Sequence, residues 1–157
     1  MRHLALILAL TATAYADVKS GERARDFEQK TLRGDTVKLS QMRGKVVLLD
    51  FWASWCEPCK RELPILAKMA PRLKEQGVEI VSVNIDDKKD NAEAFLRSHG
   101  LDLTVVYDKD HKIVGEWAPP KMPSSFVIDR AGVIRAVNEG FDAGDEAKLE
   151  KQLTAIR

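Results

Sequence analysis

The chain has 157 residues, a length that corresponds to one domain of ordinary size. Hydrophobic residues make up 45% and charged residues 31% of the composition, which excludes a disordered, collagen-like or repetitive chain and allows a real core. The formal net charge of +1 gives no sign of a nucleic acid or an acidic membrane as partner.

Residues 1–16 have the layout of a secretory signal peptide. A short polar start precedes the apolar run 4–10, and Ala14-Tyr15-Ala16 closes the segment with an A-x-A cleavage pattern. A membrane anchor is the alternative, but the apolar run is well short of the ~20 residues that span a bilayer. We therefore expect cleavage after Ala16, a mature domain of residues 17–157, a periplasmic or otherwise exported location, and no stable membrane insertion.

The order of the expected elements indicates an α/β fold after the polar residues 17–25, which we expect to be loosely held. Nearly continuous apolar and β-branched runs predict strands at 46–52 and 78–85, buried on both faces. The other expected elements, in chain order, are strands at 26–31 and 36–39 around a glycine turn, a helical turn at 40–43, a helix from Cys56 to near Gly77, a helix at 91–99 stopped by Gly100, a strand at 103–107, a short helix at 112–117, a hairpin of strands at 125–129 and 133–139, and an amphipathic helix at 144–156.

This order predicts a mixed central sheet with helices on both faces. Pro64 and Pro71 lie inside the long helix and should kink it or divide it into segments. The run Asp86-Asp87-Lys88-Lys89-Asp90 mixes charges of both signs, so we expect a solvated loop there.

The two cysteines, Cys56 and Cys59, lie where a buried strand gives way to a helix. A disulfide that closes so short a loop removes little chain entropy and would stabilise the fold little. A helix N-terminus has unpaired N–H groups and a partial positive charge, and both favour a thiolate at Cys56. Cys59 lies one turn later on the same face. The spacing therefore indicates a redox-active disulfide, in which Cys56 is the exposed nucleophile and Cys59 resolves the mixed disulfide.

The carboxylate of Glu57, between the cysteines, opposes a second negative charge and should disfavour the Cys56 thiolate. A less stabilised thiolate makes the disulfide less oxidising, so we expect the pair to donate electrons.

Other uses of a Cys-x-x-Cys pair have requirements that this sequence meets poorly. A zinc site would need two more Cys or His ligands, and beyond residue 16 the chain offers only His99 and His111, in dissimilar segments. Covalent haem attachment needs a histidine directly after the second cysteine, where this chain has Lys60. We therefore expect no metal and no cofactor, while an inert structural disulfide stays open as an alternative.

Two motifs resemble the signatures of the thioredoxin superfamily. The sequence FWASWCEPCK at 51–60 resembles its active-site signature, and MPSSFVID at 122–129 resembles its cis-proline loop and the strand that follows. With GKVVL at 44–48 and the signal peptide, the chain is most similar to the exported TlpA/ResA-like thiol–disulfide oxidoreductases. This resemblance covers the chain from Arg25 onward. It implies a thioredoxin-like fold with an N-terminal β-hairpin extension and an extra helix and strand around 86–107.

The resemblance also implies where a substrate binds. Pro123 would be the cis proline that faces the disulfide and shapes a groove for a substrate backbone; an ordinary trans proline is the alternative. Met122 precedes it in the same loop, and Trp55 matches the tryptophan beside the nucleophile. Pro64 matches the kink in the active-site helix of the family.

Two acidic residues match positions that assist the cysteines in relatives. Asp50 matches the buried aspartate beneath the second cysteine, and Glu62 matches the active-site glutamate of ResA-like proteins. The resemblance therefore implies that one of these carboxyls, partly buried and with a raised pKa, would take or give the proton of Cys59 during exchange. The alternatives are a strand-end residue that backbone donors satisfy for Asp50, and a solvated helix face for Glu62.

The combined expectation is an exported enzyme that reduces disulfide-containing protein substrates. Relatives serve cytochrome c maturation and receive electrons from a membrane-bound thiol reductase, which we expect here as well. Two other classes stay open. A peroxiredoxin-like peroxidase would need a Thr-x-x-Cys site, where this chain has Ser54-Trp55 before Cys56. A Sco-like copper-binding module would space its cysteines one residue further apart and add a histidine, for which only His111, or Met122 in its place, could be invoked.

Overall fold

A five-stranded mixed sheet forms the centre of the computed structural model, which describes residues 18–156. The central strand, β3, pairs in parallel with β4 and antiparallel with β6, and the strand order is β5-β4-β3-β6-β7. The strands are β3 (Val46–Trp52), β4 (Val78–Asn84), β5 (Thr104–Tyr107), β6 (Ser124–Ile128) and β7 (Ile134–Glu139). The mixed sheet expected from the sequence is confirmed.

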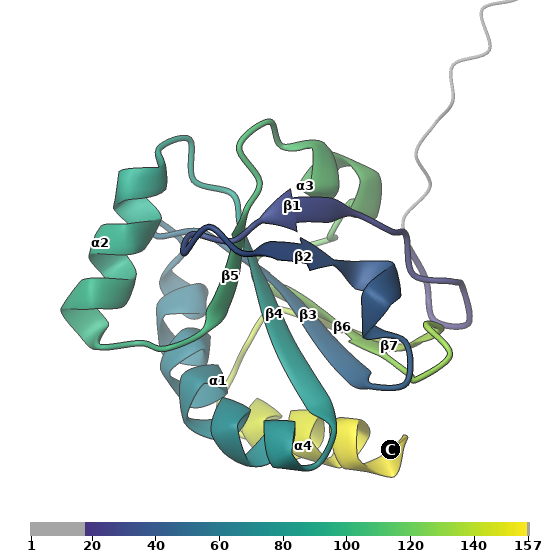
Figure 1. Ribbon diagram of the computed structural model, residues 1–157. Coiled ribbons are helices and arrows are strands. Elements are labelled where there is room, and N and C mark those ends of the chain that lie inside the picture. The colour runs from purple at the N-terminus through teal and green to yellow at the C-terminus, as the bar shows by residue number, and fades with distance from the viewer. Residues whose placement is uncertain (1–17, 157) are drawn as a thin grey trace, which may run out of the picture.

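Helices cover both faces of this sheet, as predicted (Figure 1). One face packs against α1 (Glu57–Glu75), α2 (Lys89–His99) and α4 (Asp145–Ala155). The other face packs against the hairpin of β1 (Glu28–Lys30) and β2 (Thr36–Lys38), the 3₁₀ turn η1 (Leu39–Met42) and the short helix α3 (Lys112–Trp117). The fold is therefore thioredoxin-like with the expected N-terminal hairpin.

All seven residues of β3 are buried, because the strand has hydrogen-bonded neighbours on both sides and covered faces above and below. Val46, Leu48 and Trp52 contribute to the α1 side of the core. Val47, Leu49 and Phe51 contribute to the hairpin side. This alternation explains the nearly continuous apolar run in the sequence.

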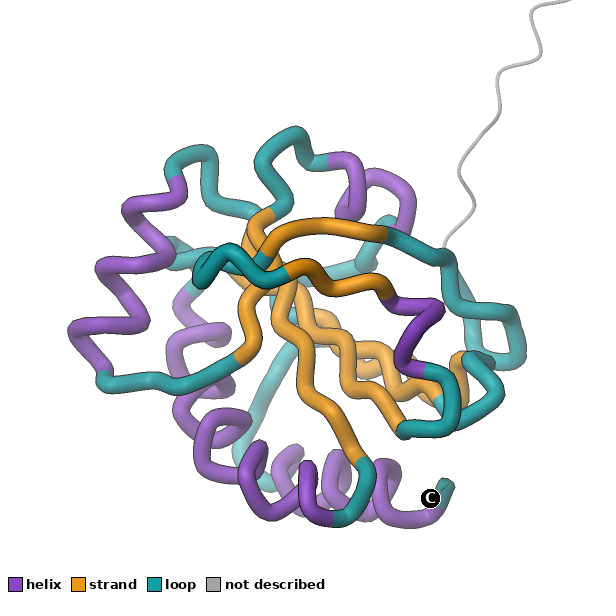
Figure 2. The backbone as a smooth tube through the Cα atoms, viewed as in Figure 1, coloured by secondary structure: helices purple, strands orange, loops and turns teal. Residues whose placement is uncertain are grey.

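Helix α1 is one unbroken helix of 19 residues (Figure 2). The prolines at 64 and 71 therefore do not divide it. Each proline removes one backbone hydrogen bond from the ladder, but Leu63, Leu66 and Leu73 are fully buried against the sheet. This apolar face holds the helix together across both positions.

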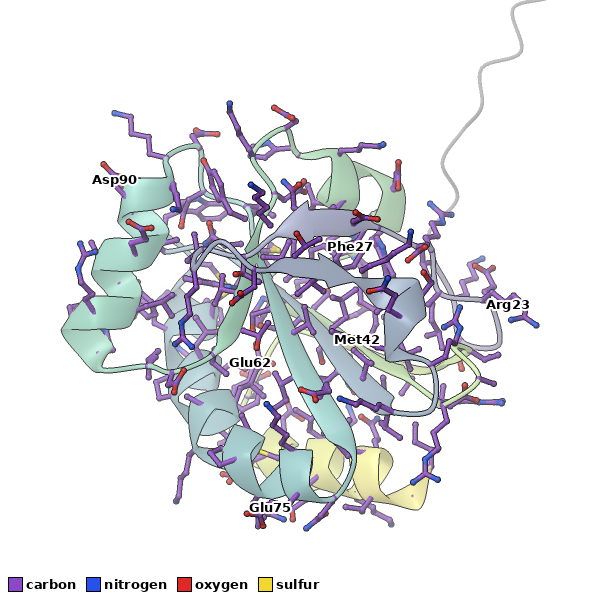
Figure 3. All side chains as sticks on the ribbon, viewed as in Figure 1. Arg23, Phe27, Met42, Glu62, Glu75 and Asp90 are labelled. Carbon is purple, nitrogen blue, oxygen red and sulfur yellow. A yellow bond between two sulfur atoms is a disulfide. The ribbon has the colours of Figure 1, made fainter. Side chains whose placement is uncertain are left out.

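The segment that precedes β1 is bound to the body of the protein, so the expectation of a loosely held start is wrong for residues 18–25. The N–H of Gly21 donates to the carbonyl of Ile134 at 2.7 Å, and the N–H of Ile134 donates to the carbonyl of Glu22 at 2.9 Å. Arg23 forms a bridge with Val133 beside the β6–β7 turn (Figure 3). Val18 is also buried. The start of β7, an edge strand, offers the backbone partners that a polar sequence pattern does not reveal.

The predicted signal peptide lies outside the described residues. Among residues 18–156, none of the helices combines the length and apolar character that crossing a bilayer requires.

Helix α2 and strand β5 form the insertion expected around 86–107. The helix begins at Lys89, two residues earlier than predicted, and ends at His99 with Gly100 in the left-handed conformation (φ 62°). β5 pairs in parallel with β4, and a bridge from Thr31 to Val106 lets the hairpin cover this edge of the sheet.

Three aromatic rings join the sheet to α3. The rings of Phe51, Phe126 and Trp117 are all fully buried, and the Phe126 centroid lies 5.8 Å from that of Phe51 and 5.0 Å from that of Trp117. Both contacts are edge-to-face, the arrangement that aromatic quadrupoles favour.

Phe126→Ala should lower the free energy of unfolding by about 3–5 kcal/mol, because it leaves a cavity between two rings that cannot close. Val137, the partner of Phe126 on the edge strand, is only half-buried, so Val137→Ala should cost about 1 kcal/mol. Urea unfolding of both variants measures the difference. Equal losses would show that this aromatic group is not a principal part of the core.

Candidate active site

The loop between β3 and α1 forms the centre of the site. After Trp52 the chain makes a turn in which the N–H of Cys56 donates to the carbonyl of Ala53 at 3.1 Å. Cys56 is the N-cap residue of α1, and its Sγ accepts the backbone N–H of Cys59 at 3.3 Å. Pro58 occupies the first turn, where a missing N–H carries no cost. The predicted placement of Cys56 at a helix N-terminus is confirmed.

Cys56 and Cys59 are joined in a disulfide, with their Cα atoms 5.3 Å apart. Their accessibility is unequal: Cys56 is 5% exposed and Cys59 is fully buried. The description of Cys56 as an exposed nucleophile therefore needs correction, because in the disulfide form only a small part of its surface reaches solvent. A reagent that approaches the bond from outside still meets Cys56 first.

Trp55 is the one large hydrophobic side chain that is exposed in the described part of the chain, with 64% of its surface accessible. It directly precedes Cys56. Exposed aromatic surface next to a reactive bond suits contact with another molecule. Glu57, by contrast, is paired with Lys60 at 3.1 Å on the surface of the first helical turn, so its charge is partly offset.

The Met122–Pro123 peptide bond is cis, as the resemblance implied. Ser124 lies opposite Phe51 in the antiparallel register, so Pro123 is level with the carboxyl end of β3. It therefore lies at the same end of the sheet as the cysteines. The carbonyl of Pro123 accepts the N–H of Gly140 at 2.7 Å, and the Ser124 hydroxyl donates to the carbonyl of Lys121 at 2.6 Å. These two contacts, which the sequence did not suggest, hold the loop.

Met122, the other loop residue expected to meet a substrate, is partly buried against both halves of the core. It is therefore anchored rather than free in solvent. That Pro123 faces the disulfide, and that Met122 and Trp55 contact a substrate, stay predictions.

Asp50 and Glu62 meet inside the core, between β3 and α1. Asp50 is fully buried and Glu62 is 2% exposed. The side chain of Glu62 lies between its own helix, α1, and the sheet (Figure 3). The solvated helix face considered for Glu62 is thus wrong. Glu62 follows Cys59 by three residues, so both side chains lie on the same face of α1.

The surroundings of this acid pair are only partly polar. In the sheet register Asp50 lies beside Ser82 on β4 and Ser125 on β6. Within residues 18–156 neither carboxyl oxygen of Asp50 makes a hydrogen bond of good geometry, and the backbone N–H of Phe51 has only a minor influence on its pKa. Backbone donors therefore do not satisfy Asp50 as that alternative requires. One oxygen of Glu62 likewise has no partner there.

This environment shifts both acids in the same direction. Burial raises the pKa of Asp50 to about 7, and Ser82 and Glu62 limit the rise. Burial also raises the pKa of Glu62 to about 10, with further increases from the charges of Asp50 and Asp145. Since the two carboxyls interact, they titrate as a pair. At neutral pH the pair therefore retains at least one proton.

A cavity of about 20 Å³ borders the Glu62 side chain. Its lining includes Ser125, Asn138, Asp145 and the exposed Lys148. It therefore extends from the buried carboxyl toward the surface near the start of α4. Among residues 18–156 no cluster of three or more His, Cys, Asp or Glu side chains is arranged to hold a metal ion.

Asp86 contradicts the expectation of a solvated loop at 86–90. Its side chain is fully buried and contacts Ser54 in the active-site turn, while Lys89 and Asp90 belong to α2. The mixed charges of the run concealed this residue. Its position just after a buried strand that runs parallel to β3 was the signal that could have revealed it.

The comparisons with known proteins agree with this geometry. Residues 20–137 match the family model described as the AhpC/TSA family. The chain is 33% identical over 161 residues to the thiol-disulfide oxidoreductase ResA of Geobacillus kaustophilus, covering 98% of this chain and 91% of the relative. It is 35% identical to the ResA of Bacillus subtilis over 87% of this chain and 80% of the relative.

Solved structures show the same relationship. A crystal structure from Chlorobium tepidum, provisionally named thiol:disulfide interchange protein DsbE, superposes with a TM-score of 0.84 at 37% identity. The match covers 89% of this chain and 99% of that chain. Sequence, fold and cysteine geometry thus lead to one assignment: the chain belongs to the AhpC/TSA family of the thioredoxin superfamily and is a thiol–disulfide oxidoreductase related to ResA.

Proposed function

We propose that this oxidoreductase reduces disulfide bonds of protein substrates outside the cytoplasm, by cycling its own Cys56–Cys59 pair. The observation that carries the proposal is the unequal placement of the cysteines. Cys56 caps α1 and keeps the only accessible surface of the pair, whereas Cys59 is buried behind it. One sulfur is thus positioned to meet a substrate and the other to complete the exchange.

The reaction begins with both cysteines reduced. The Cys56 thiolate attacks one sulfur of the substrate disulfide, forms a mixed disulfide and releases the other substrate sulfur as a thiolate. Cys59 then loses its proton and attacks Cys56, which forms the Cys56–Cys59 disulfide and releases the second substrate thiolate. The substrate gains two electrons and two protons, and the protein dithiol loses them. The helix N-terminus favours the first thiolate.

Asp50 and Glu62 are proposed to handle the proton of Cys59. Cys59 is buried, so water has little access to its thiol. Glu62 lies one helical turn away, and a carboxyl pair that is partly protonated at neutral pH both accepts and returns a proton. The cavity beside Glu62 supports a connection from this pair to the surface.

Trp55, Met122 and Pro123 are proposed to bind the substrate. Trp55 offers exposed aromatic surface beside Cys56. Pro123 and Met122 belong to a loop at the same end of the sheet as Cys56. Gly140 and Ser124 hold this loop in place. A fixed loop and an exposed ring together favour an extended substrate segment over a small molecule.

The reducing direction is supported by the groups around Cys59. Burial and the neighbouring acid pair both disfavour a thiolate there, and a dithiol whose thiolates are poorly stabilised forms a weakly oxidising disulfide. Glu57 contributes less than the sequence suggested, because Lys60 offsets its charge.

The exported location rests on the predicted signal peptide at 1–16. The roles in cytochrome c maturation, and a membrane-bound thiol reductase as electron donor, rest on the resemblance to TlpA/ResA-like proteins. Disulfide-containing proteins are the substrate class that the oxidoreductase chemistry supports most directly.

Cys59→Ala should trap a covalent mixed disulfide between Cys56 and a protein substrate, because the resolving thiol is gone. Incubating the reduced variant with insulin and separating the products on a non-reducing gel measures the adduct. Cys56→Ala is the matched control and should give none. An equal yield of adduct from both variants would contradict the separate roles.

The reduction potential of the pair should be near the ~−270 mV of thioredoxin rather than the ~−120 mV of DsbA, because the surroundings of Cys59 disfavour thiolates. Equilibration with glutathione buffers of graded redox ratio, read by alkylation of free thiols, gives the value. A potential near that of DsbA would make the protein an oxidant and overturn the proposed direction.

Asp50→Asn should slow disulfide exchange at least about tenfold while the protein stays folded. A raised folded-state pKa means that the acid contributes stability below its ordinary pKa of 3.8 and that this contribution is lost as the pH rises to about 7. The variant should therefore be more stable than the wild type at pH 8, by on the order of 4 kcal/mol, and gain almost nothing near pH 4.

Stopped-flow exchange kinetics and urea unfolding at the two pH values measure these effects. The exposed Asp110, changed to Asn, is the control and should alter neither. Exchange rates for Asp50→Asn that match the wild type across the pH range would rule out the proton-transfer role.

A further inference from the structure

Asp86 lies at the end of the sheet where strands β3 and β4 finish and the active-site loop begins. Strands β3 and β4 are parallel and end together, with Trp52 opposite Asn84. The N–H of Ile85 donates to the carbonyl of Trp52 at 3.0 Å, so the chain after β4 stays beside the chain after β3. Asp86 follows, and its side chain is fully buried.

The carboxylate of Asp86 is surrounded by donors from two neighbours. The backbone N–H of Ser54 lies 3.2 and 3.1 Å from its two oxygens, and the Ser54 hydroxyl donates to Oδ1 at 2.8 Å. The Asn84 amide donates to Oδ2 at 2.8 Å and, through its own oxygen, accepts the Asp86 N–H at 3.1 Å. Asn84 thus orients the carboxylate, and the carboxylate holds Ser54.

A carboxylate accepts from all of these partners at once: the Ser54 N–H, the Ser54 hydroxyl and the Asn84 amide. An amide in its place offers one acceptor oxygen instead of two, so the Ser54 hydroxyl would have to reverse its role and accept, and the charge that strengthens the bonds to Ser54 would be lost. A fully buried carboxylate is costly unless its hydrogen bonds are made, so this residue type at this place indicates a geometric role.

The held residue belongs to the turn that presents Trp55 and Cys56. One backbone hydrogen bond, from Cys56 to Ala53, closes this 53–56 turn. Trp55 cannot anchor the turn by packing, because 64% of its surface is exposed. Cys56 is fastened to α1 by its disulfide and by the N–H of Lys60, which donates to its carbonyl. Ser54 is fastened through both its backbone and its side chain to Asp86, in the segment that follows β4.

We propose that Asp86 is a positioning residue of the active site, which holds the 53–56 turn through Ser54 so that Trp55 stands beside Cys56 in the orientation that a protein substrate meets. The inference rests on the proposed contact between Trp55 and substrate, but not on the direction of electron flow. Loss of the Asp86–Ser54 contact should weaken the capture of protein disulfides and leave the intrinsic reactivity of Cys56 nearly intact.

The test compares Asp86→Asn, Ser54→Ala and the double variant with the wild type. Asp87→Asn is the matched control. It removes the same charge at the next residue in the chain, whose side chain is 92% exposed. Thermal unfolding first verifies that each variant is folded. If Asp86→Asn does not fold, Ser54→Ala still removes the 2.8 Å hydroxyl bond and carries the test.

Two readouts separate positioning from general stability. In ¹⁵N relaxation, the order parameters of Ser54 and Trp55 should fall from about 0.85 to below about 0.6 in Asp86→Asn. In kinetics, kcat/KM for insulin reduction should fall about tenfold through KM, while the rate with glutathione disulfide changes less than about twofold. Because both single changes break the same contact, the double variant should be no worse than Asp86→Asn.

Unchanged order parameters in the folded variants would overturn the inference, as would equal losses with insulin and glutathione disulfide. Effects of Asp87→Asn equal to those of Asp86→Asn would overturn it too, since charge and not contact would then be the cause. A wild-type protein that does not reduce insulin would overturn the reductase proposal alone, because the order parameters of Ser54 and Trp55 still decide whether Asp86 holds the turn.

Discussion

Strand β3 is hydrogen-bonded to β4 and β6 and buried on both faces, and the site is built around its carboxyl end. A strand fixed in this way cannot shift its register without moving its apolar residues out of both halves of the core. The point where β3 ends, and therefore the point where α1 begins, is set to within a residue. Cys56 becomes the N-cap of α1, where its sulfur accepts a backbone N–H and meets the positive end of the helix dipole.

The same burial gives the acid pair its chemical character. Asp50 points to the α1 side of a strand that is otherwise apolar, and Glu62 meets it from the helix. Few hydrogen bonds compensate their removal from water, so both acids hold protons more tightly than exposed carboxyls do. Two poorly compensated acids cost folding free energy, and such local conflicts with a stable core are typical of functional sites. Here the conflict lies one helical turn from Cys59, on the same face of α1.

Several chain segments meet at the end of the sheet where β3 finishes, and each is held by a specific contact. Asp86, after β4, fastens the turn before Cys56. Ser124 and Gly140 fasten the cis-proline loop before β6. The positions of these segments follow from the sheet, while Trp55 is the one large hydrophobic side chain among residues 18–156 that is exposed to solvent. Rigid surroundings and one exposed aromatic ring suit the proposed reaction with disulfides of other proteins.

The pattern of residues along the chain is enough to tell which elements form and where the cysteines lie. The periodic pattern of apolar residues located β3 and α3 to the residue and the other elements to within a few residues. This is possible because the burial of apolar side chains produces the pattern. The motif at 51–60 placed Cys56 at a helix start, because strand and helix meet there. Resemblance, and not composition, supplied the cis bond before Pro123 and the two acids.

The roles of the polar residues, by contrast, depend on the folded arrangement. The burial of Asp86, the docking of residues 18–25 and the pairing of Glu57 with Lys60 depend on partners that are distant in the chain or on side-chain directions. A polar residue in a sequence has the same appearance whether water or a buried donor satisfies it. The difference arises when the parallel strands β3 and β4 bring Ser54 and Asp86 together at the end of the sheet. No local sequence pattern encodes this meeting.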